Sequence, residues 1–215
     1  GREQGWGHLR ECLAVARIFQ REGIGSRFFI PANNEPARTV IEKEGYTIVN
    51  ALPASEGSAV VSNLVTVSPD YSKRLRQLTP RWAVITEHED EEMAPVNFNV
   101  CREPRYMPLH SIFQKEPARE TRPKIERVLV CMGGTDPKNA TGFAMEMFRQ
   151  CIEWGWLPRD LHFDVIAGPL FEYRSFLTGL PDRFPGHVQV RGPLSPEALL
   201  AAVHEADVAV TTGGD

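Results

Sequence analysis

The segment from Val128 to Thr141, VLVCMGGTDPKNAT, constrains the fold more than any other stretch of this chain. It begins with five apolar residues, Val128–Met132, and such a run is typical of a strand buried on both faces, as in a parallel sheet. Gly133 and Gly134 end this strand. Asp136 then suits the N-cap of a helix, and the proline after it suits the first helical position. The segment therefore predicts a unit of strand, glycine turn and helix.

Apolar residues with helical spacing follow the turn. They recur at i, i+3, i+4, i+7, i+8 and i+11, which predicts one face of an amphipathic helix: Ala140, Phe143, Ala144, Met147, Phe148 and Cys151. A glycine turn lets a ligand approach bare backbone, and a helix N-terminus offers unpaired N–H groups to an anion. We therefore expect a phosphorylated ligand at this turn. A plain capped turn without a ligand is the alternative.

Composition excludes several classes of protein. Hydrophobic residues make up 42% and charged residues 24%, as in an ordinary soluble globular protein. Lys and Arg number 24 against 28 Asp and Glu, and no basic stripe indicates a nucleic-acid partner. No apolar run approaches the roughly 18 residues of a membrane span, and no metal-ligand spacing is present. The scattered cysteines Cys12, Cys101, Cys131 and Cys151 are expected to be small buried hydrophobes in a reducing, cytoplasmic compartment.

Strands and helices alternate along the first half, which favours a parallel sheet. We expect strands at 27–30, 46–49, 59–61, 82–85 and 96–100, and helices at 9–19, 36–44 and 69–78. A G-x-G-H turn made by Gly5, Gly7 and His8 leads directly into the first helix. Such a turn normally follows a strand, so we expect that the first strand is missing and that the chain is an excerpt of a longer protein.

His8 is the first candidate catalytic group. It is expected at the N-terminus of the first helix, where the positive end of the helix dipole disfavours imidazolium. A neutral imidazole at pH 7 is what a general base requires. A histidine that only caps the helix or bonds to the loop is the alternative.

The middle of the chain changes character. Residues 102–124 contain four prolines, which interrupt helices and inner strands, so they are expected to connect two domains, with one short helix near 110–114. The acidic run 87–92, EHEDEE, fits a solvated loop better than a metal site.

The second half repeats the alternation, with strands expected at 128–132, 161–167, 187–191 and 207–210 and helices at 140–151, 171–178 and from Pro196. It contains a turn at Gly168 and a last glycine turn at Gly213 and Gly214, where a following helix is again expected beyond the chain. Glycine turns in both halves suggest an α/β protein of two Rossmann-like domains facing a cleft, at residues 1–101 and 125–215. Neither G-x-G-x-x-G nor a P-loop is present, so neither a dinucleotide cofactor nor an ATPase site is indicated.

Four segments resemble one family, in the family's order: GWGHLRECLAVA, YMPLHSIF, VLVCMGGTDPKNAT and DVAVTTGG. They are similar to UDP-sugar hydrolases of the pseudaminic acid pathway and to their spore-coat polysaccharide relatives, over essentially the whole chain. The resemblance implies a two-domain GT-B fold, which glycosyltransferases share. It implies that water attacks the anomeric carbon of a UDP-linked deoxy or acetamido sugar and expels UDP, in nonulosonate or surface-glycan biosynthesis, with His8 as the base.

The same resemblance implies where UDP binds. The residues that match are Gly5, Gly7, Gly133, Gly134, Thr135, Asp136, Asn139, Gly168, Gly213 and Gly214. Backbone N–H groups of the glycine turns would hold the diphosphate. The implied partner is the UDP-sugar, without a cofactor or metal, and the protein could be fused to or work with other sugar-biosynthesis enzymes.

The chain departs from the family at three places. Glu11 stands where the family usually has arginine, and His110 replaces an arginine of the linker. Ser62, Asn63 and Leu64 stand where the family has Asp-x-Tyr. These departures leave three functions open: a UDP-sugar hydrolase, a GT-B glycosyltransferase that uses a UDP-sugar, and a non-catalytic nucleotide-sugar-binding domain.

Overall fold

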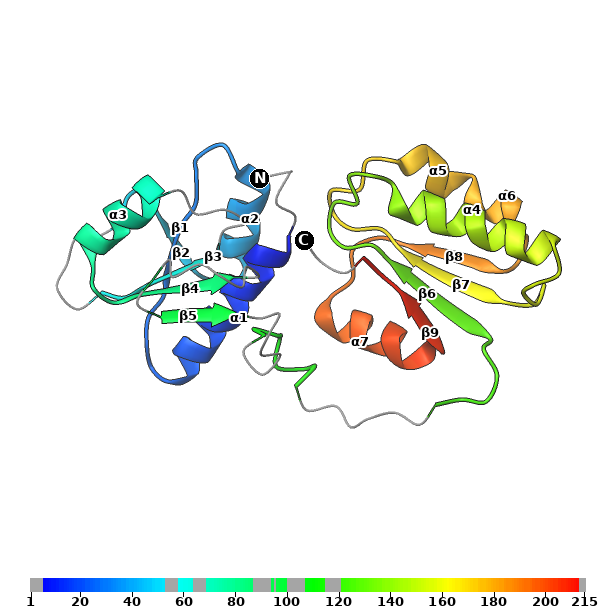
Figure 1. The fold of residues 1–215 in the computed structure, drawn as a ribbon, viewed down its shortest axis with the longest axis horizontal. Helices are drawn as coiled ribbons and strands as arrows, with labels where there is room; N and C mark the ends of the chain where they lie inside the picture. Colours follow the sequence, from blue (N-terminus) through cyan, green and yellow to red (C-terminus); the bar gives the residue numbers. More distant parts are fainter. Residues whose placement is uncertain are drawn as a thin grey trace. The chain divides into compact units, whose positions relative to one another are not determined.

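The structure is a computed structural model that describes residues 6–52, 58–63, 69–86, 94, 96–99, 107–114 and 121–212 (Figure 1). The chain divides into two compact units, His8–His110 and Ser111–Asp215. The division falls between His110 and Ser111. The acidic run 87–92 and the final glycine turn lie outside the described residues.

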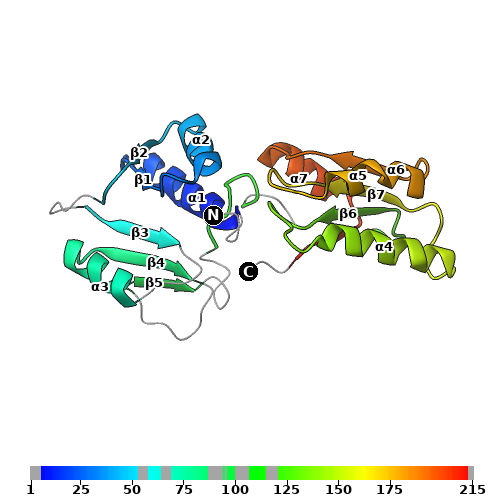
Figure 2. The ribbon, with the colours of Figure 1, turned by 90° about the horizontal axis from the view of Figure 1, so that it is seen from above.

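The first unit contains two parallel sheets. In one sheet β1 (Arg27–Phe29) pairs with β2 (Thr47–Val49). In the other the order is β3 (Val60–Asn63), β4 (Trp82–Thr86) and β5 (Val96–Asn99). Helices α1 (Gly7–Arg21), α2 (Glu35–Lys43) and α3 (Pro69–Leu78) alternate with these strands (Figure 2). These elements match the expected alternation closely.

Two small cores hold this unit together. In one core, Leu13 of α1 and Ile41 of α2 are fully buried and pack in one cluster with Phe28 of β1. Leu75 of α3 packs against Trp82 of β4. Each core thus joins helices to the strands that they connect.

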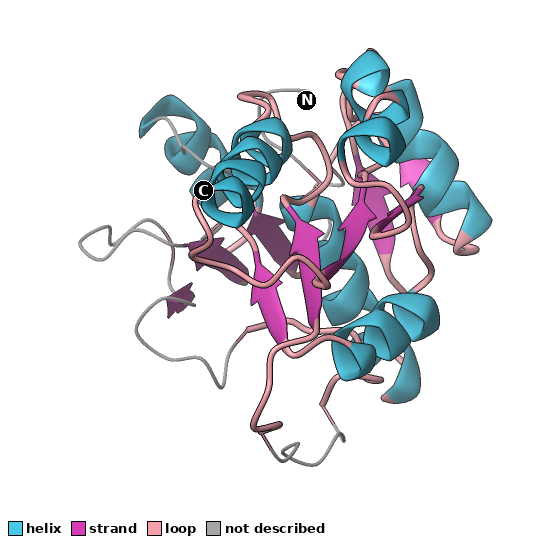
Figure 3. Cartoon of the chain, turned by 90° about the vertical axis from the view of Figure 1, so that its right-hand side faces the viewer, coloured by secondary structure: helices cyan, strands magenta, loops and turns pink. Residues whose placement is uncertain are grey.

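The second unit contains a four-stranded parallel sheet in the order β8-β7-β6-β9. Its strands are β6 (Arg127–Cys131), β7 (His162–Ile166), β8 (Val188–Arg191) and β9 (Val208–Val210). One face is covered by α4 (Ala140–Glu153), α5 (Arg174–Thr178) and α6 (Leu180–Arg183), and the other by α7 (Pro196–Glu205) (Figure 1). Figure 3 shows helices on both sides of the strands.

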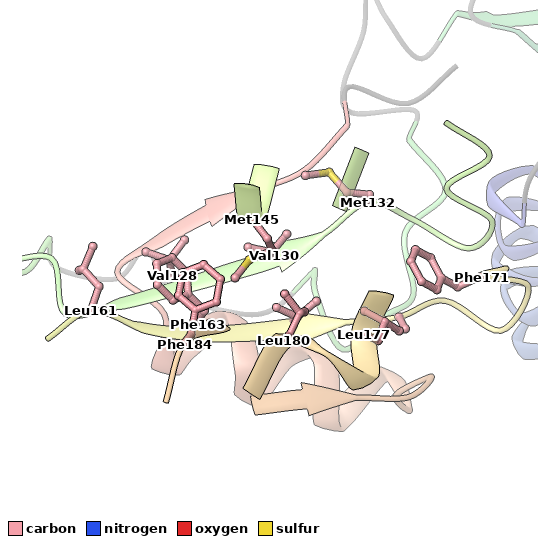
Figure 4. Close-up of a cluster of buried hydrophobic side chains, with 12 residues drawn as sticks. Val128, Val130, Met132, Met145, Leu161, Phe163, Phe171, Leu177, Leu180 and Phe184 are labelled. Atoms are coloured by element: carbon pink, nitrogen blue, oxygen red, sulfur yellow. The ribbon is translucent and has the colours of Figure 1, made fainter. Parts of the chain in front are cut away.

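The apolar run of β6 is buried on both faces, as its sequence predicts. Val128 and Val130 face the larger core, where they meet Met145 of α4 (Figure 4). Leu129 points the other way, into a core with Ala202 of α7. Alternation of side chains along a strand explains this division.

Hydrogen bonds of Asp207 link the start of β9 to the start of β6. Its carboxylate accepts hydrogen bonds from the backbone N–H groups of Glu126, at 2.8 Å, and Arg127, at 2.9 Å, and pairs with Arg122 at 3.0 Å. These backbone N–H groups, helped by the Arg122 charge, lower the pKa of Asp207 below its usual value. A contact across about 80 residues therefore fixes the register of β9.

Three sequence expectations need correction. In α4 the predicted face is right for Ala140, Ala144 and Phe148, which pack against the core, and wrong for Phe143, which is 72% exposed, and Met147, which is 39% exposed. Met145, outside the predicted face, is fully buried. The helix expected near 110–114 is a hydrogen-bonded turn over residues 111–114. The helix expected at 171–178 starts later, as α5, and a short α6 follows it.

Candidate functional site

The turn after β6 is the first candidate site, in the second unit. Gly133, Gly134 and Thr135 form the turn, and Gly133 has a φ of +82°, which favours glycine. The backbone N–H groups of these three residues donate to no acceptor among the residues that the structure describes. Consecutive amides without such an acceptor, in a turn at the carboxyl edge of a parallel sheet, are suited to binding an anion.

The N-terminus of α4, by contrast, is already occupied by side chains. The buried carboxylate of Asp136 accepts hydrogen bonds from the N–H groups of Ala140, at 2.6 Å, and Thr141, at 2.9 Å. Asn139 accepts from the N–H of Gly142 at 3.1 Å through its side chain. The first amides of α4 therefore have partners within the protein, and the free amides are those of the preceding turn.

This arrangement corrects the predicted helix start. The N-cap is Asn139 and not Asp136, and Pro137 lies in a turn before the helix. An ordinary N-cap has an extended backbone, but Asp136 and Asn139 have φ values of 43° and 53°. Asp136 therefore caps α4 from a distance of four residues, through its side chain.

The loop after β7 holds the turn in place. A Cβ atom at Gly168 would lie 2.3 Å from the carbonyl oxygen of Gly134 and 2.4 Å from that of Gly133, so only glycine fits there. Leu170 donates from its N–H to the same Gly134 oxygen at 3.0 Å, and the Tyr173 hydroxyl donates to the Pro137 carbonyl at 2.9 Å. Packing alone explains Gly168, and its effect is to fix the shape of the turn.

The third strand end at this edge belongs to β9. Both β7 and β9 pair with β6 in parallel, so the carboxyl ends of all three strands meet at one edge. Thr211 and Thr212 follow β9 there. Gly213 and Gly214, which come next, lie outside the described residues, as does Gly5.

A second cluster of polar side chains lies in the first unit, around His8. Nδ1 of His8 is 2.6 Å from Oδ1 of Asn63, the last residue of β3. The Asn63 amide nitrogen donates to the Glu11 carboxylate. All three side chains are partly buried. His8 therefore makes a specific polar contact with a strand end, beyond its place in the first turn of α1.

In the sequence, Glu11 and Asn63 are apparent only as departures from a family pattern. The spacing of His8 and Glu11, three residues apart on one helix, already places both on the same side of α1. The partnership of Asn63 with either residue spans more than 50 positions and has no signal in a single sequence.

Neighbouring groups have structural explanations. Ser62 is buried and its hydroxyl accepts a hydrogen bond from the Trp82 indole N–H at 2.9 Å, which ties β3 to β4. Burial, with a smaller contribution from Glu11, raises the pKa of the Cys12 thiol to about 12. Gly7, the first residue of α1, is exposed, and a Cβ atom there would meet nothing within 4 Å.

Two further findings concern metals and membranes. Within the described ranges, no three His, Cys, Asp or Glu side chains gather in a way that would hold a metal ion. None of the described helices is both long and apolar enough to cross a membrane.

Comparison with known proteins supports the fold. No family model matches the chain. Across 99% of its length the chain is 20% identical to the uncharacterized protein MJ1062 of Methanocaldococcus jannaschii, and it spans about half (50%) of that relative's length. The crystal structure of MurG from Acinetobacter baumannii is similar with a TM-score of 0.51 and 15% identity, over 97% of this chain and 69% of that one. The chain therefore has a Rossmann-like α/β fold of the GT-B type.

Proposed function

We propose that the chain hydrolyses a UDP-linked deoxy or acetamido sugar by attack of water at the anomeric carbon, with release of UDP. The observation that carries the proposal is the row of free amides at Gly133, Gly134 and Thr135, set at the carboxyl edge of a parallel sheet. Three N–H groups in that place suit the oxygens of a diphosphate. They would also stabilise the charge that develops on UDP as it leaves.

His8 is the proposed general base for the attacking water. Its Nδ1 is engaged by Asn63, and Nε2 bonds to no residue that the structure describes. A general base needs a free nitrogen within reach of the water. The resemblance of the G-x-G-H turn and first helix to the UDP-sugar hydrolases supports the same role.

The test is release of UDP from a panel of UDP-linked acetamido and deoxy sugars, without an acceptor. We expect release from one of them, and a loss of about 10²- to 10⁴-fold in His8→Ala, the range typical of a lost general base. His162→Ala is the matched control, because His162 is exposed at the amino end of β7, away from the glycine turn. No release from any sugar would contradict hydrolysis.

A glycosyltransferase is the second candidate, and the structural likeness to MurG favours it as much as it favours hydrolysis. This candidate predicts little release of UDP until an acceptor is added. A nucleotide-sugar-binding domain would bind UDP equally well in the wild type and in His8→Ala, with no turnover. The same assay, run with and without candidate acceptors, separates the three.

A further inference from the structure

We propose that Asn63 and Glu11 are positioning residues for His8, which hold its neutral imidazole in the tautomer with the proton on Nδ1. Nε2 then carries the lone pair that can accept a proton. The catalytic consequence rests on the proposed function, but the tautomer itself does not.

The Glu11 carboxylate determines how the Asn63 amide is oriented. An ionised carboxylate only accepts hydrogen bonds, whereas the side-chain amide of asparagine has one donor end and one acceptor end. The Asn63 nitrogen donates to Glu11, so the Asn63 oxygen must face the other way. A flipped amide would set its oxygen against the carboxylate and leave two acceptors in contact.

The orientation of Asn63 then decides the state of His8. The Asn63 oxygen lies 2.6 Å from Nδ1 of His8, and an oxygen acceptor requires a donor there. Nδ1 must therefore carry a hydrogen, and in the neutral ring Nε2 does not. The hydrogen bond between Glu11 and Asn63 thus fixes the orientation of the Asn63 amide, and that orientation fixes which nitrogen of His8 carries the hydrogen.

This arrangement suits a base that must accept a proton once per turnover. When Nε2 takes the proton of the attacking water, Nδ1 continues to donate to the same Asn63 oxygen, so no partner has to move. The carboxylate of Glu11, which accepts from the other end of the Asn63 amide, supplies a negative charge near the protonated ring. A base that a third group orients in this way is a recurrent arrangement at catalytic sites.

The distinction from a purely structural contact is measurable by NMR of the full chain labelled with ¹⁵N-histidine, at pH 8.5, where histidine is ordinarily neutral. The His8 signals are those that disappear in His8→Ala. We expect a protonated Nδ1 and an unprotonated Nε2 in the wild type. In Asn63→Ala, and in Glu11→Met, which removes the carboxylate, we expect the two tautomers to mix.

Glu11→Gln is the matched variant, because its amide oxygen can still accept from the Asn63 nitrogen and should preserve the Nδ1–H tautomer. It also keeps the test valid if Asn63→Ala fails to fold. A wild-type ring protonated on Nε2, or a ring still fixed as Nδ1–H in both Asn63→Ala and Glu11→Met, would overturn the inference.

Release of UDP gives the second readout. We expect the rate of UDP release to fall about tenfold or more in Asn63→Ala, as when a partner that orients a histidine is removed from a metal site, and to fall less in Glu11→Gln than in Glu11→Met. If the wild type releases no UDP from any sugar, hydrolysis fails while the tautomer result stands by itself. If UDP release is unchanged in Asn63→Ala, the positioning role is wrong although hydrolysis stands.

Discussion

At the scale of single residues, the glycine turn after β6 depends on a residue outside it. Gly168 lies against the carbonyl oxygens of Gly133 and Gly134 with no room for a methyl group. The free amides of the turn therefore owe their direction to the loop after β7. This is a physical reason for glycine at position 168 that requires no ligand contact.

Gly168→Ala is expected to displace the turn, because the new Cβ would meet backbone and not a flexible side chain. Such overpacking lowers the free energy of unfolding by about 1–3 kcal/mol. The displaced turn should also bind UDP less well, with a Kd about tenfold higher. Gly192→Ala is the matched control, since a Cβ atom there meets nothing within 4 Å. Thermal unfolding and calorimetric titration with UDP check both variants. Equal behaviour of the two variants would show that Gly168 does not support the site.

Residues also mark where sequence reasoning stops. The free amides follow from a strand, two glycines and a turn, all local features that the sequence predicts. The role of Asp136 as a cap four residues before the helix depends on a left-handed backbone at a residue other than glycine, which is uncommon. The pairing of Asn63 with His8 depends on a contact between α1 and the end of β3, which no local pattern encodes.

At the scale of elements, α4 shows how a hydrophobic period can mislead. Two apolar stripes run side by side on this helix, one through Phe143 and Met147 and the other through Met145 and Phe148. The sequence does not say which stripe faces the sheet. Packing against β6 and β7 selects the second, and Phe143 stays 72% exposed.

The two stripes can be compared by the same substitution at two methionines. Met145 is fully buried, so Met145→Ala is expected to lower the free energy of unfolding by about 2–5 kcal/mol. Met147 is 39% exposed, and Met147→Ala should change the free energy of unfolding by no more than about 0.5 kcal/mol. Urea unfolding followed by circular dichroism measures both. A larger loss at Met147 would mean that the first stripe is the buried one.

At the scale of the whole molecule, the alternation of strands and helices predicts an α/β chain with parallel sheets in two units, and the structure has this architecture. The order of the strands within each sheet is not encoded locally. In the second unit β9 lies beside β6, a pairing that Asp207 secures through contacts with Glu126 and Arg127. This pairing brings a third strand end to the edge where the free amides lie.

The proposed function of the whole chain requires that a nucleoside diphosphate binds at the turn after β6. The most direct measurement is a titration of the ¹⁵N-labelled chain with UDP, followed by the chemical shifts of the backbone amides. We predict the largest changes at Gly133, Gly134 and Thr135, whose N–H groups donate to none of the described residues, and small changes at Ala140 and Thr141, whose N–H groups donate to Asp136. An absence of binding, or changes that leave Gly133, Gly134 and Thr135 unaffected, would contradict the account.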